Sequence, residues 1–283
     1  MHTRSLKQEP ATVLEMRGAS KRVVEGIDHS YRAFHDFSLN VYAGERLGIF
    51  AVNGFEAKAM VACLSGVEPL DSGSVEHRAS VSWPLGTNDA FLGKLSGYVN
   101  ARFAAEIYSQ PGKIEDDMRL IQELAGFDET MFHEPLADWP AINKACLKLA
   151  VSLAFEFDVV TVGRISCWDH RAIHPRAARI REHFEQRIAG RTLIVSASGQ
   201  SNLAIDYCDE GLALVNGELA YRGDPEVCLE MVKEESRRQK QDRRQRVNKR
   251  IADLLGDDDS DESSEDALIE SRDKSDGDIL VLR

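Results

Sequence analysis

The sequence has few cysteines and no long apolar run, and these two features argue against a membrane protein, a zinc protein and a disulfide-bonded protein. Its 283 residues contain nothing close to the roughly 18 consecutive apolar residues of a membrane span. Residues 1–16 lack the apolar segment of a secretory signal. The five cysteines have no paired spacing, which argues against a zinc site or a disulfide framework. We therefore expect a cytoplasmic protein, and a hydrophobic content of 43% is enough for a large core.

Charge is unevenly distributed along the chain. The formal net charge is −12, which argues against nucleic acid as a partner of the main body. Residues 233–250 carry nine Lys/Arg and three acidic residues, whereas residues 256–283 carry eleven acidic and three basic residues. This pattern predicts a globular part over 1–232, a basic helix over 233–255 and an acidic, disordered tail over 256–283.

The globular part alternates strand-like and helix-like patterns. Short buried strands are predicted at 158–162 and 192–198. Between the early strands and these two, apolar residues recur at three- and four-residue spacing, which predicts helices through about 91–156. The order predicts an α/β fold with a parallel sheet core and a helical subdomain.

The end of the globular part contains a hairpin and the start of a helix. Asn216 and Gly217 supply the two positive-φ positions of a type I′ turn, which joins two short strands. Asp224 and Pro225 then suit the cap and the first residue of the next helix.

Residues 48–66, GIFAVNGFEAKAMVACLSG, have the outline of a phosphate-binding loop. A short apolar strand meets a turn at Asn53-Gly54, and a helical pattern follows over 57–65. Such loops follow the pattern G-x-x-x-x-G-K-[ST]. Its glycines let backbone N–H groups reach the phosphates, its lysine neutralises their charge and its hydroxyl holds Mg²⁺. The lysine is missing from its place here.

The order of elements resembles the nucleotide-binding subunit of ABC transporters. Four stretches look like the polysaccharide-export branch, which includes capsular polysaccharide and teichoic acid exporters: residues 81–108, 149–163, 191–198 and 208–232. The resemblance covers roughly residues 12–232. It implies a P-loop NTPase-like fold with an antiparallel β subdomain, ATP and Mg²⁺ as ligands, and a membrane permease as partner. It also implies a cytoplasmic location at the inner (plasma) membrane.

The positions that match the phosphate loop carry unsuitable side chains. They are occupied by Ala51, Asn53, Gly54, Glu56, Ala57, Lys58 and Ala59. Glu56 replaces a glycine, and its carboxylate would repel a phosphate by about 4 kcal/mol at ~4 Å and a dielectric constant of ~20. Ala57 replaces the lysine. With one extra loop residue Lys58 would take that role, but the stretch has the expected length, so we place Lys58 at the former hydroxyl position.

The other motifs of the resemblance are also substituted. The strand at 158–162 is followed by Gly163-Arg164, where an aspartate for Mg²⁺ and a glutamate for water activation are expected. Residues 140–143 replace the serine-glycine signature that offers N–H groups to a partner's phosphate. The expected histidine, Q-loop glutamine and adenine-stacking aromatic are replaced by Ala197, Leu92 and Val23.

These substitutions affect charged, hydroxyl and glycine positions, while the apolar framework persists. They predict no catalytic residue, no cofactor-binding residue and no metal site. The chain is then a degenerate ATP-binding-like subunit that assembles or regulates a polysaccharide export complex. Two alternatives stay open: an ATPase with residual activity, and a soluble scaffold without a transporter. Expected partners are a permease and, in a dimer, a competent ATPase paralogue or a second copy. Both composite sites of such a dimer would be incomplete.

Three further features have more than one interpretation. Trp83 and Pro84 suit either a transporter contact or ordinary packing. His170 and His174 have the spacing of metal ligands on a helix, but Pro175 follows and no third ligand is evident, so solvated histidines are favoured. The basic helix suits anionic lipid, an acidic partner or the chain's own tail, and a solvated helix is the favoured interpretation.

Overall fold

A computed structural model of the chain describes residues 10–25, 29–87, 91–165 and 175–255. The chain forms two compact units, residues 1–236 and 237–283. Within the described residues, no helix combines the length and the apolar composition needed to cross a membrane.

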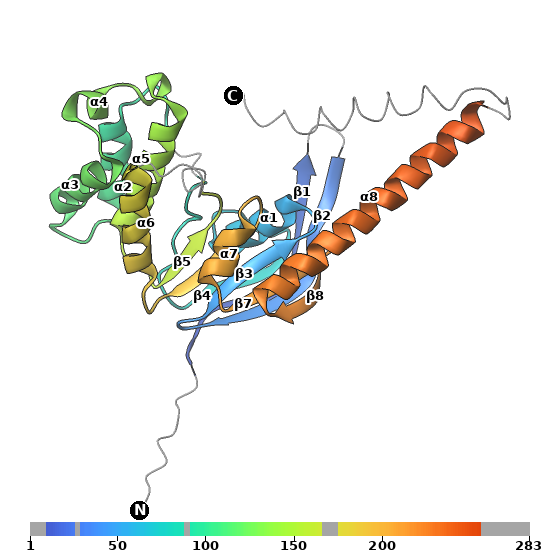
Figure 1. The fold of residues 1–283 in the computed structure, drawn as a ribbon. Coiled ribbons are helices and arrows are strands. Elements are labelled where there is room, and N and C mark those ends of the chain that lie inside the picture. Colours follow the sequence, from blue (N-terminus) through green and yellow to red (C-terminus); the bar gives the residue numbers. More distant parts are fainter. Residues whose placement is uncertain (1–9, 26–28, 88–90, 166–174, 256–283) are drawn as a thin grey trace, which may run out of the picture. The chain divides into compact units, whose positions relative to one another are not determined.

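Two β-sheets form the framework of the first unit (Figure 1). The smaller sheet is antiparallel, has the order β2-β1-β4 and consists of β1 (Thr12–Glu25), β2 (His29–Tyr42) and β4 (Ser72–His77). The larger sheet has the order β5-β6-β3-β7-β8 and consists of β3 (Arg46–Ala51), β5 (Val159–Val162), β6 (Thr192–Ser196), β7 (Glu210–Val215) and β8 (Glu218–Gly223). Its first four strands are parallel, and β8 is antiparallel to β7.

The turn between β7 and β8 follows the sequence prediction. Val215 pairs with Glu218, so Asn216 and Gly217 alone form the connection. Their φ angles are 54° and 79°, the left-handed values that a type I′ turn requires and that these two residue types tolerate best. The predicted hairpin is confirmed.

The four parallel strands of the larger sheet are buried on both faces. On β3, Leu47 and Ile49 pack against helix α1 (Gly54–Leu64) and the smaller sheet, while Phe50 faces the helices on the opposite side. A parallel sheet covered on both faces is rich in β-branched and aliphatic residues, as the four residues of β5 illustrate. Helix α1 thus lies between the two sheets, which fixes the position of the loop that precedes it.

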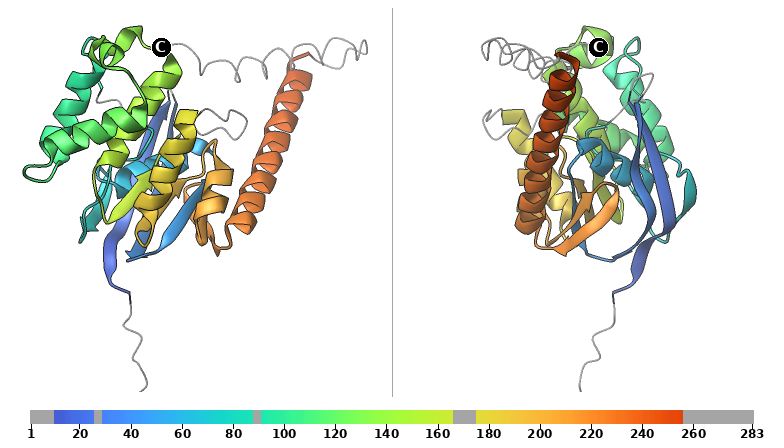
Figure 2. Two further views of the ribbon diagram at one scale, coloured as in Figure 1. Left: turned by 60° about the vertical axis from the view of Figure 1, so that its left-hand side comes forward. Right: turned by 90° about the vertical axis from the view of Figure 1, so that its right-hand side faces the viewer.

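A separate group of helices forms the helical subdomain beside β5 (Figures 1 and 2). It consists of α2 (Gly97–Tyr108), α3 (Ile114–Ala125), α4 (Glu129–His133), a short 3₁₀ turn (Leu136–Asp138) and α5 (Ala141–Ala154). Ser96 and Asp128 cap the first turns of α2 and α4, each accepting a backbone N–H with its side chain. The predicted helical region is therefore present.

The remaining helices pack on the larger sheet or extend from it. They are α6 (Pro175–Ile188), α7 (Ser201–Tyr207) and α8 (Pro225–Leu255). Asp224 caps α8 as expected, because its Oδ1 accepts the N–H groups of Glu226 and Val227 at 2.8 and 3.2 Å. The sequence did not predict α7, and the strand predicted over 192–198 ends at Ser196.

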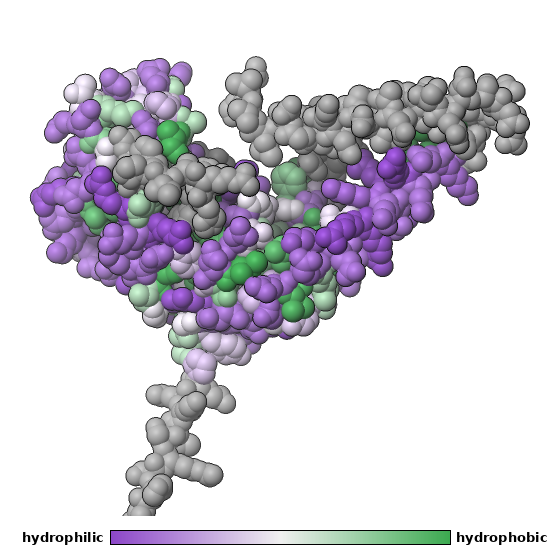
Figure 3. Space-filling view, in the orientation of Figure 1, coloured by the Kyte–Doolittle hydropathy of each residue, from purple (hydrophilic) through white to green (hydrophobic). Residues whose placement is uncertain are grey.

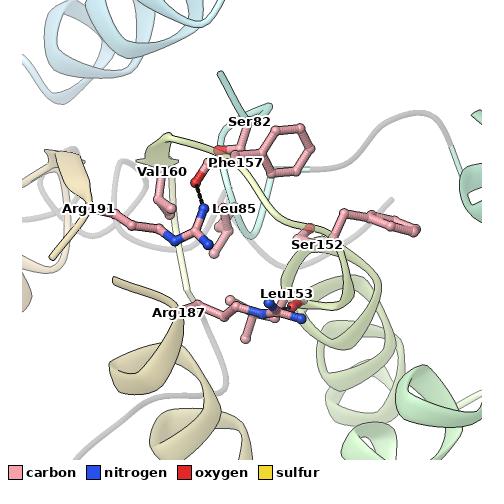
Figure 4. A pocket seen from close by; sticks show the side chains of 9 residues that line it. Ser82, Leu85, Ser152, Leu153, Phe157, Val160, Arg187 and Arg191 are labelled. Atoms are coloured by element: carbon pink, nitrogen blue, oxygen red, sulfur yellow. Dashed lines mark hydrogen bonds between the residues drawn. The ribbon is translucent and has the colours of Figure 1, made fainter. Parts of the chain in front are cut away.

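Two arginines of the α6 region hold the C-terminal end of α5 in place (Figure 4). Arg187 donates to the carbonyl oxygens of Leu153 and Ala154, both at 2.9 Å, and Arg191 donates to the carbonyl oxygen of Phe157. The last carbonyls of a helix have no partner within the helix, so these bonds replace water there. The adjoining cavity measures only about 10 Å³, so this junction is nearly closed.

Candidate functional site

The candidate site lies at the carboxyl ends of three parallel strands. The connections that follow β3, β5 and β6 begin at Val52, Gly163 and Ala197. Because β3 and β5 both flank β6 in parallel, these connections emerge at one edge of the sheet. That edge is where open α/β sheets bind ligands, and three of the predicted motif positions meet there.

The phosphate-loop position is a capped helix start. Only Val52 and Asn53 separate β3 from α1. The Asn53 side chain accepts the N–H of Phe55 at 3.0 Å, and the Asn53 carbonyl accepts the N–H of Glu56 at 3.0 Å. Two of the amides that would face a phosphate are therefore already bonded within the protein. The predicted helix start at residue 57 was three residues too late, because the capping residue is Asn53.

Gly54 brings this helix start against the connection after β6. A Cβ atom at Gly54 would lie 2.3 Å from Ser198 Oγ, closer than two such atoms can be. A side chain at position 54 therefore requires Ser198 Oγ to move. The two connections are thus in direct contact at this point.

Glu56 is buried, which corrects the expectation of a carboxylate in a phosphate pocket. It is 6% exposed, and its Oε2 has no hydrogen-bond partner. Burial raises the pKa of Glu56 from 4.5 to about 7. The side chain lies on the face of α1 that also buries Ala57 and Met60, and it is not among the residues that line the adjacent hollow.

Lys58 is half-buried, in the second turn of α1 rather than at its start. Its Nζ lies 5.3 Å from the centre of the Phe55 ring, within the range of a cation–π contact. Burial, with a smaller contribution from the positive charge of Arg164, lowers the pKa of Lys58. Two cationic groups therefore stand near each other, where the resemblance implies the hydroxyl that holds Mg²⁺ and the glutamate that activates water.

The connection after β5 is packed too closely for an acidic residue. Residues 81–87 run parallel to β5, and Leu85 bridges to Val162. A Cβ at Gly163 would lie 2.5 Å from Thr87 Cγ2, and a Cβ at Gly86 would lie 1.7 Å from the Arg164 carbonyl oxygen. A carboxylate at position 163 requires Thr87 to move.

Gln200 holds this connection in place, although no motif in the sequence marks it. Its Oε1 accepts the N–H of Ile165 at 2.8 Å, and its Nε2 donates to the carbonyls of Gly163 and Ser196 at 2.8 and 2.9 Å. One neutral amide thus joins the ends of β5 and β6. No local pattern predicts contacts between residues 35 or 37 positions apart.

The signature position begins α5 without a side-chain cap. Pro140 precedes the helix, and its carbonyl accepts the N–H groups of Asn143 and Lys144 at 3.0 and 3.1 Å. Ile142 is exposed, so a bulky side chain stands where close approach of a phosphate requires glycine. Leu92, at the Q-loop position, is also exposed.

Ala197 lines a hollow of about 380 Å³ beside the loop. The wall comes from the connections after β3 and β6 and from the first turns of α8, with Lys233 at the α8 side. Val23 pairs with Tyr31 across β1 and β2. The Tyr31 ring lies 6.5 Å from that of Phe55, so the aromatic beside the loop is Tyr31, which the sequence analysis missed.

The remaining predicted features are structural or lie outside the described residues. Trp83 donates to Ser152 Oγ at 3.0 Å and packs against the tilted ring of Tyr108 with ring centres 4.6 Å apart, which favours packing over a transporter contact. His170 and His174 fall outside the part of the chain that the structure describes. In the described part, no group of three or more His, Cys, Asp and Glu side chains is placed to hold a metal ion.

Comparison with known proteins identifies relatives among export ATP-binding proteins. No family model matches the chain. The capsule polysaccharide export ATP-binding protein CtrD of Neisseria meningitidis is 30% identical over 185 residues, which is 65% of this chain and 82% of that protein. The ATP-binding protein BexA of Haemophilus influenzae is 30% identical over 64% of this chain and 81% of that protein. The polysialic acid transport ATP-binding protein KpsT of Escherichia coli is 22% identical, over 68% and 87%.

Solved structures agree on the fold. The ATP-binding cassette MJ0796, in a dimeric post-hydrolysis state bound to ADP and phosphate, superposes with a TM-score of 0.61. It is 13% identical, over 75% of this chain and 98% of that chain. The parallel sheet, the antiparallel sheet and the helical subdomain correspond to this fold. The chain therefore belongs to the ATP-binding subunits of ABC transporters, in the branch that exports capsular and related polysaccharides.

Proposed function

We propose that the chain is a catalytically degenerate subunit of a polysaccharide export complex, with an assembly or regulatory role. The observation that carries the proposal is the helix start at Gly54. The amides after Asn53 are bonded internally, and neither a lysine nor a hydroxyl stands where the phosphates and Mg²⁺ would be held. The residues present do not fit Mg·ATP.

The connection after β5 supports the same conclusion. Metal-assisted phosphoryl transfer needs a carboxylate for Mg²⁺ and a group that orients water. Gly163 offers no ligand, and Arg164 remains protonated at any useful pH. The neutral amide of Gln200 bonds the backbone at this point. The fold is kept while the groups for hydrolysis are absent.

An exposed apolar stripe on α2 supports docking to a membrane subunit. Val99, Phe103 and Ile107 are spaced by four residues, so they share one face of the helix. Phe103 and Ile107 are 63% and 55% exposed. Contiguous apolar side chains on a protein surface mark interaction sites, whereas single exposed apolar residues are common and need no explanation. This stripe lies in the 81–108 stretch that resembles the polysaccharide-export branch.

A dimer with a competent ATP-binding partner leaves both composite sites incomplete. One site would combine the partner's phosphate loop with Pro140 and Ile142 of this chain. The other would combine the capped Gly54 helix start with the partner's signature. In such a heterodimer, nucleotide binds weakly and on the partner's phosphate loop. This chain then contributes to the assembly of the complex and not to hydrolysis.

Affinity purification of the tagged chain from its native membrane tests the proposal. We expect a polytopic permease, alone or with a competent ATP-binding protein, to be recovered with the chain. Replacing Phe103 and Ile107 by serine should reduce the recovery on the order of tenfold. Val227→Ser, which changes an exposed apolar residue at the start of α8, is the matched control and should recover the permease normally.

Two results contradict the proposal in different ways. Recovery of no membrane subunit with the unmodified chain refutes the export-complex role. Equal recovery with the Phe103/Ile107 variant and the control places the docking surface elsewhere than on α2.

A further inference from the structure

The part of α8 in the second unit, which begins at Arg237, is strongly basic. Between residues 237 and 250 it has eight Lys/Arg and a single acid, Asp242, a net charge of +7. Residues 240–249 are exposed. The helix is coloured as hydrophilic along its exposed length in Figure 3. A surface this basic, in a chain of net charge −12, attracts anionic groups.

The basic residues repel one another within the helix. Lys240 and Arg244 are four positions apart, as are Arg246 and Arg250. Each like-charged pair at this spacing destabilises a helix by about 0.2–0.5 kcal/mol. Because the helix contains two such pairs, an anionic partner that binds here also stabilises it.

We propose that this partner is the acidic segment of the same chain, residues 256–283. This segment follows Leu255 directly and carries eleven acidic and three basic residues, a net charge of −8 against +7 on the helix. Direct attachment through a short connection gives an effective concentration in the millimolar range. The binding is electrostatic, so it weakens as the Debye length falls from about 8 Å at physiological ionic strength to about 3 Å at 1 M salt.

The arrangement of the charges favours a flexible acidic chain over a flat lipid surface. At about 100° of rotation per residue, the eight basic residues of 237–250 fall on all sides of the helix. A membrane contacts one side only, whereas a polypeptide reaches several. Helices that lie in membranes also need a broad apolar face, and here only Val247 and Ile251 interrupt the polar residues between 237 and 251.

The consequence is that the acidic segment screens the basic helix from other anions. Anionic lipids, nucleic acids and acidic proteins compete with an intramolecular partner. The basic surface is then available only when that segment is displaced or its charge is changed.

Zero-length carbodiimide cross-linking of the full chain tests the contact. Carbodiimide joins lysine amines to carboxylates that touch them, and the basic helix contains Lys240 and Lys249. We expect Lys240 and Lys249 to couple to carboxylates within 256–283, independently of protein concentration and with loss at high salt. Lys113, which is exposed in the first unit, is the matched control. Coupling of the acidic segment to Lys113 as often as to Lys240, or no coupling at all, overturns the proposal.

Binding to phosphatidylglycerol vesicles gives an independent measurement. In one variant every Asp and Glu of 256–283 becomes Asn and Gln, which keeps the length of the chain. A second variant ends at Leu255. Both should bind the vesicles on the order of tenfold more tightly than the full chain. Equal binding by the three proteins overturns the proposal, as does a neutralised variant that binds no better than the full chain.

Discussion

The buried carboxyl group of Glu56 makes the stability of the fold depend on pH in a predictable direction. Burial raises the pKa of Glu56 from 4.5 to about 7 in the folded chain. The folded state therefore holds this proton more tightly than the unfolded state does. Stability falls as pH rises from 4.5 towards 7 and is constant above that range, because there both states are deprotonated.

The size of the effect follows from the two pKa values. The difference between 4.5 and about 7, at about 1.4 kcal/mol for each pH unit, corresponds to about 3 kcal/mol. Glu56 lies in the first turn of α1, where the helix dipole favours a negative charge by up to ~1 kcal/mol. The expected destabilisation above neutral pH is therefore about 2 kcal/mol.

Glu56→Gln removes the charge at nearly constant shape. Urea unfolding followed by circular dichroism should give similar free energies for variant and parent at about pH 5, where Glu56 is protonated in the folded state. At about pH 8 the variant should be more stable by about 2 kcal/mol. Glu123→Gln, an exposed change on α3, is the matched control and should not alter the pH dependence. A variant whose unfolding free energy parallels that of the parent from acid to alkaline pH refutes the reasoning.

Two further predictions concern packing around the site. Gly54→Ala should destabilise the fold by about 2 kcal/mol because the new methyl group meets Ser198 Oγ, and Ser198→Ala in the same chain should restore most of the loss in a thermal melt. Arg187→Ala should cost about 3 kcal/mol, since the carbonyls of Leu153 and Ala154 lose their donor. Arg119→Ala, on the exposed face of α3, should change the melting temperature little; an equal loss in both arginine variants contradicts the proposed role of Arg187.

Local chemistry was enough to predict several parts of the fold. Asn216-Gly217 specifies its turn because few other residue pairs tolerate two left-handed positions. Asp224 and Pro225 specify the start of α8 for an equally local reason. The buried strands β5 and β6 follow from short apolar runs.

The site itself depends on contacts that the sequence does not display. The start of α1 at Gly54 was predictable, since Asn53 is a strong capping residue. The burial of Glu56 was also predictable, because it shares a helix face with Met60 and Leu64. The bonds of Gln200, by contrast, join loops from different strands and need the three-dimensional fold.

The contact between Tyr31 and Phe55 also depends on the three-dimensional fold and has no local sequence pattern. It depends on the register of the long antiparallel pair β1 and β2, which contains several irregularities. Hydrophobic alternation alone does not locate such irregularities. The sequence therefore predicts Val23 at the position of the adenine-stacking aromatic, whereas the aromatic residue near the loop is Tyr31, which pairs with Val23 on the neighbouring strand.

Steady-state turnover of Mg·ATP by the purified full chain tests the central claim most directly. The capped helix start at Gly54 and the Gly163-Arg164 pair predict no Mg²⁺-dependent release of phosphate above a buffer control. The Lys58→Ala variant should behave identically. Turnover that depends on Mg²⁺ and disappears in the Lys58→Ala variant would contradict the account, because it would show that Lys58 performs the role of the missing lysine.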